Sequence, residues 1–254
     1  MTVKSSSFWD QCRDGAATGF FRALIGTPLD AFTTESIVSN KKTQETISTI
    51  WEKGYLYRGF WAYAGRQMLR TPVTLVSTHV GSGIYKSSAP ESAPPALRGI
   101  VVGMFVGGVE TVVVVNPFRS IQTQLLTGLS WKAIRAQGAA GLRRGLDAAL
   151  VHRVASWALF MGTYEALHEK STFVASTVAG TVQVAASSPV FVAMIRKQKA
   201  GQPNISLRQM ISKIYKENGI MGLFRPGLEF RLVHSWCVSY IAMAVMEKLG
   251  VMRR

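Results

Sequence analysis

The chain has 254 residues, of which 48% are hydrophobic and 17% are charged, and its mean hydropathy is +0.17. This balance is too apolar for a typical soluble basic protein and too polar for a helix bundle that faces only lipid. Helices that direct isolated charges into a shared aqueous cavity would reconcile the two properties. The net charge of +15 also raises nucleic-acid binding as a competing interpretation.

The placement of the basic residues argues against nucleic acid. They gather in short clusters beside apolar segments, such as Lys41-Lys42, Arg143-Arg144 and Arg196–Lys199. They do not follow one helical stripe with interleaved aromatic residues. Because such clusters suit anionic lipid head groups, we expect membrane lipid, and not nucleic acid, as a partner.

In chain order, the first predicted membrane helix spans about residues 8–32. Gly15 and Gly19 have the small-x-x-x-small spacing that allows two helices to approach closely. Arg22 lies between apolar neighbours on both sides, which favours a position facing an internal cavity over snorkelling at a helix end. The next segment, Thr43–Lys53, predicts a short amphipathic helix that lies in the membrane interface.

The second predicted membrane helix runs from the Arg58-Gly59 pair to about residue 85 and contains Arg66, Arg70 and His79. The two arginines are candidates for the same internal cavity, whereas His79 is expected to be a packing residue. The proline- and serine-rich segment 87–95 predicts a loop. This loop ends a first unit, residues 1–95.

The second unit, residues 96–170, begins with an apolar run whose only charge, between residues 99 and 118, is Glu110. A carboxylate at such a depth is costly unless it is paired or solvated, so Glu110 is a candidate functional residue. The alternative is a neutral glutamic acid that is hydrogen-bonded to a neighbouring helix. A surface segment around Trp131 follows, and then a membrane helix over about residues 146–168.

That helix also contains the residue types of a nucleophilic triad, Asp147, His152 and Ser156, without the glycine-x-serine-x-glycine elbow. We therefore do not expect an enzyme. The two cysteines, Cys12 and Cys237, are far apart in the sequence and indicate neither a disulfide framework nor a zinc site. No metal or cofactor is expected.

The third unit, residues 171–254, opens with a run free of charged residues up to residue 195, which includes Gln183. A surface helix is predicted from about residue 207, with Ser206 and Gln209 as its capping box. The last predicted membrane helix, residues 228–249, carries Glu229, Arg231 and His234.

The three units share one pattern. In each, a glycine stands nine residues before a proline that is expected to kink the first helix, and the pairs are Gly19 and Pro28, Gly108 and Pro117, and Gly180 and Pro189. A glycine and basic cluster then precedes the second helix, at residues 54–59, 138–145 and 219–227. Repeats of this length indicate one supersecondary unit used three times.

This combination of motifs resembles the mitochondrial carrier family over nearly the whole chain. The resemblance implies an all-α membrane protein with six transmembrane helices in three pseudo-symmetric repeats, each with a short amphipathic surface helix. The three units would form a single membrane domain, multi-pass in the mitochondrial inner membrane.

The resemblance also implies cardiolipin as a bound lipid, held by backbone N–H groups of the glycine turns and of the surface-helix N-termini. The alternative is that these glycines only permit tight turns. Pro226 stands where the last glycine of the third turn is expected. The residues carried over are Gly54, Arg58, Gly59, Gly138, Arg144, Gly145, Gly219 and Arg225.

In the family, a proline-x-acidic-x-x-basic motif provides a ring of ion pairs that closes the matrix end of the cavity. Here the acidic position holds Asp30, Arg119 and Phe191, and the basic position holds Thr33, Gln122 and Met194. Asp30 can still pair with Arg119, but one pair does not reproduce a threefold lock. The motif for the opposite gate is also depleted.

Two hypotheses follow. The first is a carrier that transports a small anionic metabolite by alternating access through a central cavity. The second is a carrier-fold protein that no longer transports and serves as a structural subunit of a larger inner-membrane complex of the respiratory type. Retained cavity charges favour the first, and loss of the gates favours the second. The candidate substrate-binding residues are Arg22, Arg66, Arg70, Glu110, Arg153, Gln183 and Arg231.

Overall fold

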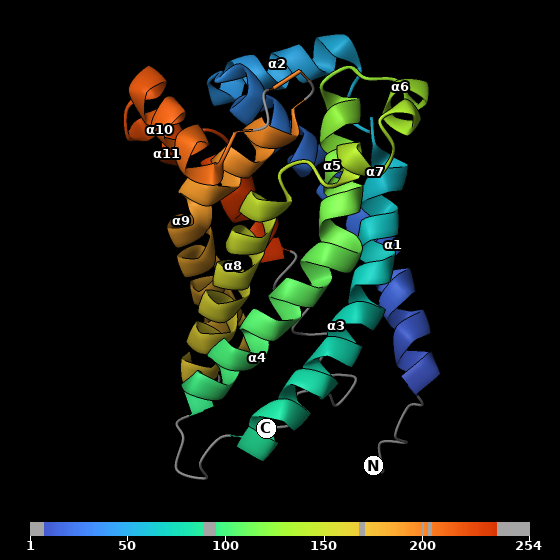
Figure 1. Cartoon of the computed structure of the whole chain (residues 1–254), viewed down its shortest axis with the longest axis vertical. Helices are drawn as coiled ribbons and strands as arrows, with labels where there is room; N and C mark the ends of the chain where they lie inside the picture. Colours follow the sequence, from blue (N-terminus) through green and yellow to red (C-terminus); the bar gives the residue numbers. More distant parts are fainter. Residues whose placement is uncertain (1–7, 89–94, 168–170, 200, 203–204, 238–254) are drawn as a thin grey trace.

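The computed structural model describes residues 8–88, 95–167, 171–199, 201–202 and 205–237, and this part of the chain is built of helices joined by turns (Figure 1). The first three helices are α1 (Phe8–Ser39), α2 (Thr43–Lys53) and α3 (Phe60–Ser88). The helix α1 continues seven residues beyond the predicted end at residue 32. Its Pro28 therefore lies inside a continuous helix.

The next long helix is continuous but changes its winding midway: α4 (Pro95–Glu110), the π-helical turn η1 (Thr111–Val115) and α5 (Asn116–Leu126). The turn η1 immediately precedes Pro117, whose ring removes one backbone donor and clashes with the preceding turn of a regular α-helix. A π turn at this place relieves that conflict and is a common feature of functional sites. The short helices α6 (Trp131–Ala136) and α7 (Gly138–Leu142) lead to α8 (Leu146–Leu167).

The last part comprises α9 (Thr172–Gln198), α10 (Leu207–Asn218), α11 (Met221–Phe224) and a helical segment at residues 228–237. Ser206 and Gln209 form the predicted capping box of α10. The described helices thus follow the order long, short, long in the first two units, and the third unit begins in the same way, with the long α9 followed by the short α10 and α11. The remainder of the predicted final helix, to residue 249, lies outside the described residues.

The long helices pack in a ring, in the order α1, α3, α4, α8, α9. The segment 228–237 closes the ring between α9 and α1. Arg231 donates to Ser188 Oγ on α9 at 2.9 Å, and the ring of Phe230 stacks on that of Phe32 on α1 at 5.2 Å. The short helices α2, α6, α7, α10 and α11 lie together at one end of the ring, at the top of Figure 1, which we call the surface-helix end.

Two segments in the described part of the chain are long and apolar enough to cross a membrane, namely Leu97–Leu126 and Phe173–Gln198. The other long helices contain more charged residues. In α3 two of these, Arg66 and Arg70, face the interior of the ring, as described below. These two inward-facing arginines lower the mean hydropathy of α3.

Small residues allow the long helices to approach closely. Gly99, Gly103 and Gly107 form a stripe on α4, and a Cβ atom added to Gly103 would lie 2.7 Å from the backbone oxygen of Trp157 on α8. The predicted close approach at Gly19 is confirmed, because a Cβ there would lie 2.5 Å from the backbone oxygen of Gln67 on α3.

Gly103→Ala is expected to lower the free energy of unfolding by about 1–3 kcal/mol, because the new methyl group forces α4 away from α8. Gly108→Ala on the same helix is the matched control, since a Cβ at Gly108 has no neighbour within 4 Å. This control should be neutral or slightly stabilising, as expected for alanine in a helix. Thermal unfolding in detergent measures both, and equal losses would contradict the packing described.

The glycines that begin the second helix of each unit share one geometry. Gly59, Gly145 and Gly227 have φ angles of +84°, +70° and +67°. Added Cβ atoms would lie 3.2 Å from Gln122, 3.1 Å from Gln198 and 3.1 Å from the backbone oxygen of Thr33, respectively. Each turn therefore packs against the adjacent long helix around the ring. Despite Pro226, Gly227 provides the third of these turns.

Candidate functional site: a cavity lined by arginines

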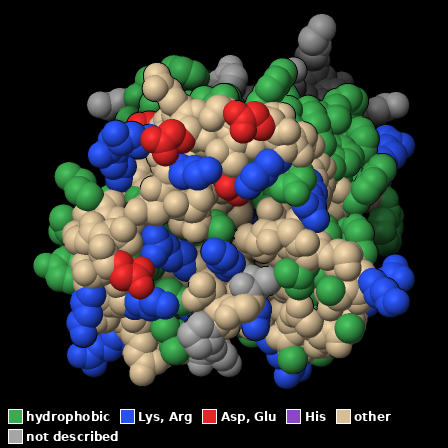
Figure 2. All heavy atoms as spheres, turned by 90° about the horizontal axis from the view of Figure 1, so that it is seen from above, with side chains coloured by type: hydrophobic (Ala, Val, Ile, Leu, Met, Phe, Trp, Pro, Cys, Tyr) green, Lys and Arg blue, Asp and Glu red, His purple; other side chains and the backbone are tan. Residues whose placement is uncertain are grey.

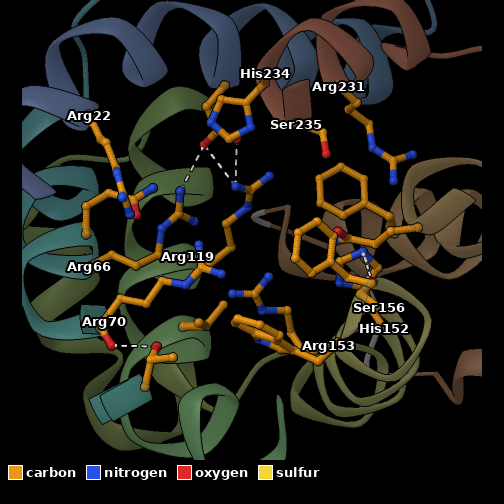
Figure 3. Close-up of a pocket in the computed structure, with 18 of the residues that line it drawn as sticks. Arg22, Arg66, Arg70, Arg119, His152, Arg153, Ser156, Arg231, His234 and Ser235 are labelled. Atoms are coloured by element: carbon orange, nitrogen blue, oxygen red, sulfur yellow. Dashed lines mark hydrogen bonds and ion pairs between the residues drawn. The ribbon is translucent and has the colours of Figure 1, made fainter. Parts of the chain in front are cut away.

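A cavity of about 220 Å³ lies inside the ring of long helices. It extends from Gly15 and Thr18 of α1 to Thr33 and Met194 near the surface-helix end. Figure 3 shows Arg22, Arg66 and Arg70 on one side of this cavity and Arg231 on the opposite side. The sequence-predicted residues that line it are Arg22, Arg66, Arg70, Arg153, Gln183 and Arg231, together with Asp30 and Arg119 of the predicted gate.

Positive charge dominates the cavity. Six of its lining residues are arginines, and the carboxylates in contact with them are Asp30, which lines the cavity, and Glu110, which lies behind its wall. Six positive charges less two negative charges leave an excess of four among the described residues. An anion would lower the electrostatic energy of this arrangement, whereas a cation would raise it.

Glu110 does not line the cavity but holds two of its arginines. Its carboxylate is fully buried and accepts hydrogen bonds from Arg70 Nε at 3.3 Å, Arg153 Nη2 at 3.0 Å and Trp157 Nε1 at 3.0 Å. Thr74 Oγ1 donates to the other carboxylate oxygen. The carboxylate therefore fixes Arg70 of α3 and Arg153 of α8 in place, and the alternative of a glutamic acid held only by neutral groups does not describe this site.

Asp30 holds a second pair of arginines, nearer to the surface-helix end. Arg119 Nη1 lies 2.7 and 2.9 Å from the two carboxylate oxygens, and Arg66 Nη2 lies 3.6 Å from one of them. The predicted pairing of Asp30 with Arg119 is thus confirmed, and Arg66 is an additional partner. Nearby, the Tyr63 hydroxyl and His234 Nε2 are 2.7 Å apart.

Arg22 differs from the other cavity arginines. Its Nε is buried without a hydrogen-bond partner, and the described residues provide it with no ion pair. The guanidinium lines the cavity from the middle of α1, as expected from its position in the sequence. A ligand can therefore bind the Arg22 guanidinium without breaking an ion pair.

The surface-helix end of the cavity is sealed by buried residues. The gate positions Thr33, Gln122 and Met194 are 3%, 1% and 2% exposed, so the uncharged residues at the basic positions fill the space tightly. Next to them, Lys197 of α9 contacts Asp147 of α8 at 2.6 Å. This second ion pair was not foreseen from the sequence.

An amide pair adds to this closure. Gln198 Nε2 donates to Asn116 Oδ1 at 3.2 Å, and Asn116 Nδ2 donates to the backbone oxygen of Leu142 at 2.6 Å. These bonds connect α9, α5 and α7. Hydrogen bonds therefore hold this end of the ring together, in addition to the ion pair of Asp30 with Arg119.

The residue types of a nucleophilic triad do not assemble into one. His152 Nε2 and Ser156 Oγ are 3.4 Å apart, but the carboxylate of Asp147 is bound by Lys197. His152 thus has no carboxylate from Asp147 to orient it, and the arrangement required for nucleophilic catalysis is not present among these three residues.

Several residues predicted to bind lipid make contacts within the protein. The Arg58 guanidinium lies over the ring of Tyr55 at 4.6 Å, and its Nη2 donates to the backbone oxygen of Leu129 at 3.5 Å. Arg144 Nη1 donates to the backbone oxygen of Lys199 at 3.4 Å. Gly54, Gly138 and Gly219 have positive φ angles and open space around them, and Arg225 is exposed.

Sequence reasoning missed Thr74 and Trp157, the neutral partners of Glu110. Thr74 follows Arg70 by four residues and Trp157 follows Arg153 by four, so each lies on the same helical face as its arginine. That spacing is the signal that could have found them. It could not show that both faces converge on one carboxylate, because this depends on how α3, α4 and α8 pack.

A family model described as "Mitochondrial carrier protein" matches residues 170–252. The chain is 29% identical to the mitochondrial citrate transporter B of Aspergillus niger over 62% of this chain and 61% of that protein. It is 23% identical to the mitochondrial arginine transporter BAC2 of Arabidopsis thaliana over 92% of this chain and 88% of that protein. The match to the citrate transporter therefore spans less than two thirds of its length.

Proposed function

We propose that the chain is a member of the mitochondrial carrier family, as the family model and the two relatives support, and that it transports a small anionic solute through its central cavity by alternating access. One observation supports the anionic solute above all: six arginines line the cavity, and only Asp30 and Glu110 balance them among the described residues. The relatives transport citrate in one case and arginine in the other, according to their names. The excess of positive charge favours a solute of the first kind.

We further propose six transmembrane segments arranged as three repeats, residues 1–95, 96–170 and 171–254, in the mitochondrial inner membrane. Three features support this arrangement. A long helix followed by short helices recurs three times in the described part of the chain, and the long helices with the segment 228–237 form a closed ring. The turns at Gly59, Gly145 and Gly227 each pack against the next long helix around this ring.

Arginine suits a carboxylate or phosphate solute, because its planar guanidinium donates two parallel hydrogen bonds to such groups. Among the cavity arginines, Arg22 and Arg231 are free of carboxylate partners in the described part of the chain. Arg66, Arg70, Arg119 and Arg153 are already held by Asp30 or Glu110. The free pair would bind the solute first, and Gln183 on α9 would add a neutral donor and acceptor to the lining.

Arg22→Gln provides a clean test of this role. Arg22 has no carboxylate partner that the substitution would leave unpaired, so the thermal stability should stay unchanged or rise. Exchange of labelled citrate in proteoliposomes should fall at least about 10-fold, which is the loss expected from one charge-assisted contact. Arg153→Gln is less informative, since it also leaves Glu110 short of a partner. Unchanged exchange by the Arg22 variant would contradict the proposal.

The alternative function is a structural subunit of a larger inner-membrane complex that has lost transport. The observation that favours it is the gate, in which one ion pair, Asp30 with Arg119, is made at the six motif positions. In that case the protein, extracted in a gentle detergent, would run as part of a large assembly on native sizing. A monomer-sized particle that exchanges solute would rule this alternative out.

Cardiolipin remains a proposed bound lipid. Figure 2 views the surface-helix end and shows many Lys and Arg side chains there with few acidic ones. Exposed Lys42, Lys53, Arg135, Arg143 and Arg225 belong to this end. Such a face would attract anionic head groups, and the glycine turns offer backbone N–H groups close by. We propose that Gly54, Gly138 and Gly219, whose surroundings are open, contact the phosphates.

A further inference from the structure

Phe191 occupies the place where the third carboxylate of the gate is expected, and two arginines flank its ring. The guanidinium carbon of Arg231 lies 4.1 Å from the ring centroid, and that of Arg119 lies 5.1 Å from it. The imidazole of His152 lies 5.0 Å from the same ring. An aromatic residue thus stands beside two guanidinium groups at the sealed end of the cavity.

The charges in this region do not balance. Arg66, Arg119 and Arg231 contribute three positive charges, and Asp30 contributes one negative charge, which leaves an excess of two among the described residues. The ring quadrupole of Phe191 attracts each guanidinium by about 0.5–2 kcal/mol. It does not supply the negative charge that a carboxylate would bring to this position.

The same region contains buried polar atoms without hydrogen-bond partners. They are Nε and Nη2 of Arg119, Nδ1 of His152 and Oγ of Ser187, and all three residues line the cavity. An unsatisfied buried polar group of this kind costs about 1–3 kcal/mol. The Arg119 nitrogens and the Ser187 hydroxyl are donors that an oxygen-rich anion would satisfy, and His152 Nδ1 is a third in the tautomer that carries its proton.

We propose that an anionic group of the transported solute, a carboxylate or a phosphate, binds beside Phe191 between Arg119 and Arg231 and supplies the missing third charge of the gate. The solute itself then completes the charge balance of the sealed surface-helix end. This inference rests on the proposed transport function and specifies how the solute couples to the gate. The closed state of a carrier that retains only one gate carboxylate, Asp30, would in this way be more stable when the carrier is loaded.

Phe191→Glu tests the proposal directly. The carboxyl carbon of a glutamate lies about as far from Cβ as the centre of a phenyl ring does, so its carboxylate can reach both flanking guanidinium groups. The variant should be more stable than the wild type without ligand, because it carries its own third charge. Phe191→Gln is the matched control, since it removes the ring and adds no charge.

The measurement is thermal unfolding in detergent with sodium citrate or sodium phosphate, against sodium chloride at equal ionic strength. We expect each anion, or citrate alone, to raise the Tm of the wild type and of the Gln variant by about 5 °C at a concentration about 10 times its Kd. The shift should fall below about 1 °C in the Glu variant and in Arg231→Gln. A Glu variant that responds to the anions as the wild type does would overturn the proposal.

The measurements distinguish a failure of the anion subsite from a failure of the proposed transport function. If the anions raise the Tm in the way that depends on the charge at residue 191, but the protein exchanges no solute in proteoliposomes, the anion subsite is supported and the transport function is refuted. A wild type that exchanges citrate with no shift, or with the same shift in all variants, would retain transport and refute the subsite. Binding of citrate without phosphate would identify a carboxylate as the preferred group.

Discussion

Glu110→Gln should lower the free energy of unfolding by about 3 kcal/mol and reduce solute exchange to background. The carboxylate is fully buried and serves Arg70 and Arg153 together. Its neutralisation leaves two guanidinium groups in the cavity wall without their counter-ion, which is costly in a poorly hydrated site. Thermal unfolding and exchange of labelled citrate measure the two effects.

A second substitution controls for the loss of charge balance. In Glu110→Gln with Arg153→Gln, one positive charge is removed along with the negative one, so the double variant should be more stable than the sum of the two single losses predicts. Additive losses would mean that Glu110 and Arg153 are not energetically coupled. Thr74→Val, which removes one neutral hydrogen bond to the same carboxylate, should cost about 1 kcal/mol.

Asp30→Asn should have an effect of similar size at the other cluster. The buried Asp30 carboxylate is the counter-ion of Arg119 and lies 3.6 Å from Arg66 Nη2. Its neutralisation therefore leaves both guanidinium groups without a counter-ion at the sealed end. We expect a loss of about 3 kcal/mol in stability. Exchange should also fall, because alternating access requires this end to close in one half of the cycle.

Two comparisons separate the ion pair from simple packing. Asp30→Asn combined with Arg119→Gln should recover part of the lost stability, as coupled partners do. Thr33→Val alters a buried neighbour one turn away on α1 without changing a charge, and its effect should stay near 1 kcal/mol. If Thr33→Val were as damaging as Asp30→Asn, the sealed end would depend on packing rather than on the ion pair.

Much of this architecture could be predicted from the sequence, because it depends on local signals. The capping box at Ser206 and the isolated Arg22 in an apolar segment each determine a local feature of a helix. The pairing of Asp30 with Arg119 could be expected as well. It follows from the repeated proline motif, which places both residues at the same level of the ring.

Other features depend on packing between helices that are distant in the sequence. In the sequence, Glu110 is an isolated charge in a valine-rich run. Two arginines contact it only because α3 and α8 pack against α4 in the folded chain. The ion pair of Lys197 with Asp147 likewise joins α9 to α8. The extension of α1 beyond residue 32 was missed because Pro28 was expected near its end, although proline is compatible with a continuous helix.

Phe191 illustrates the same limit for the site. The sequence marks it as a lost carboxylate, which suggests a weakened gate. The structure shows instead that the guanidinium groups of Arg119 and Arg231 both lie over its ring. A substitution that breaks a motif can thus create a different interaction at the same place.

The proposed transport of an anion depends most on the sign of the cavity charge, and the initial rates of uptake of labelled citrate and labelled arginine test this sign directly. Both are measured side by side in proteoliposomes that contain the wild-type protein, with empty vesicles as the background. The four excess positive charges predict that citrate enters at least about 10-fold faster than arginine. Uptake of arginine at a rate equal to or above that of citrate would contradict the account.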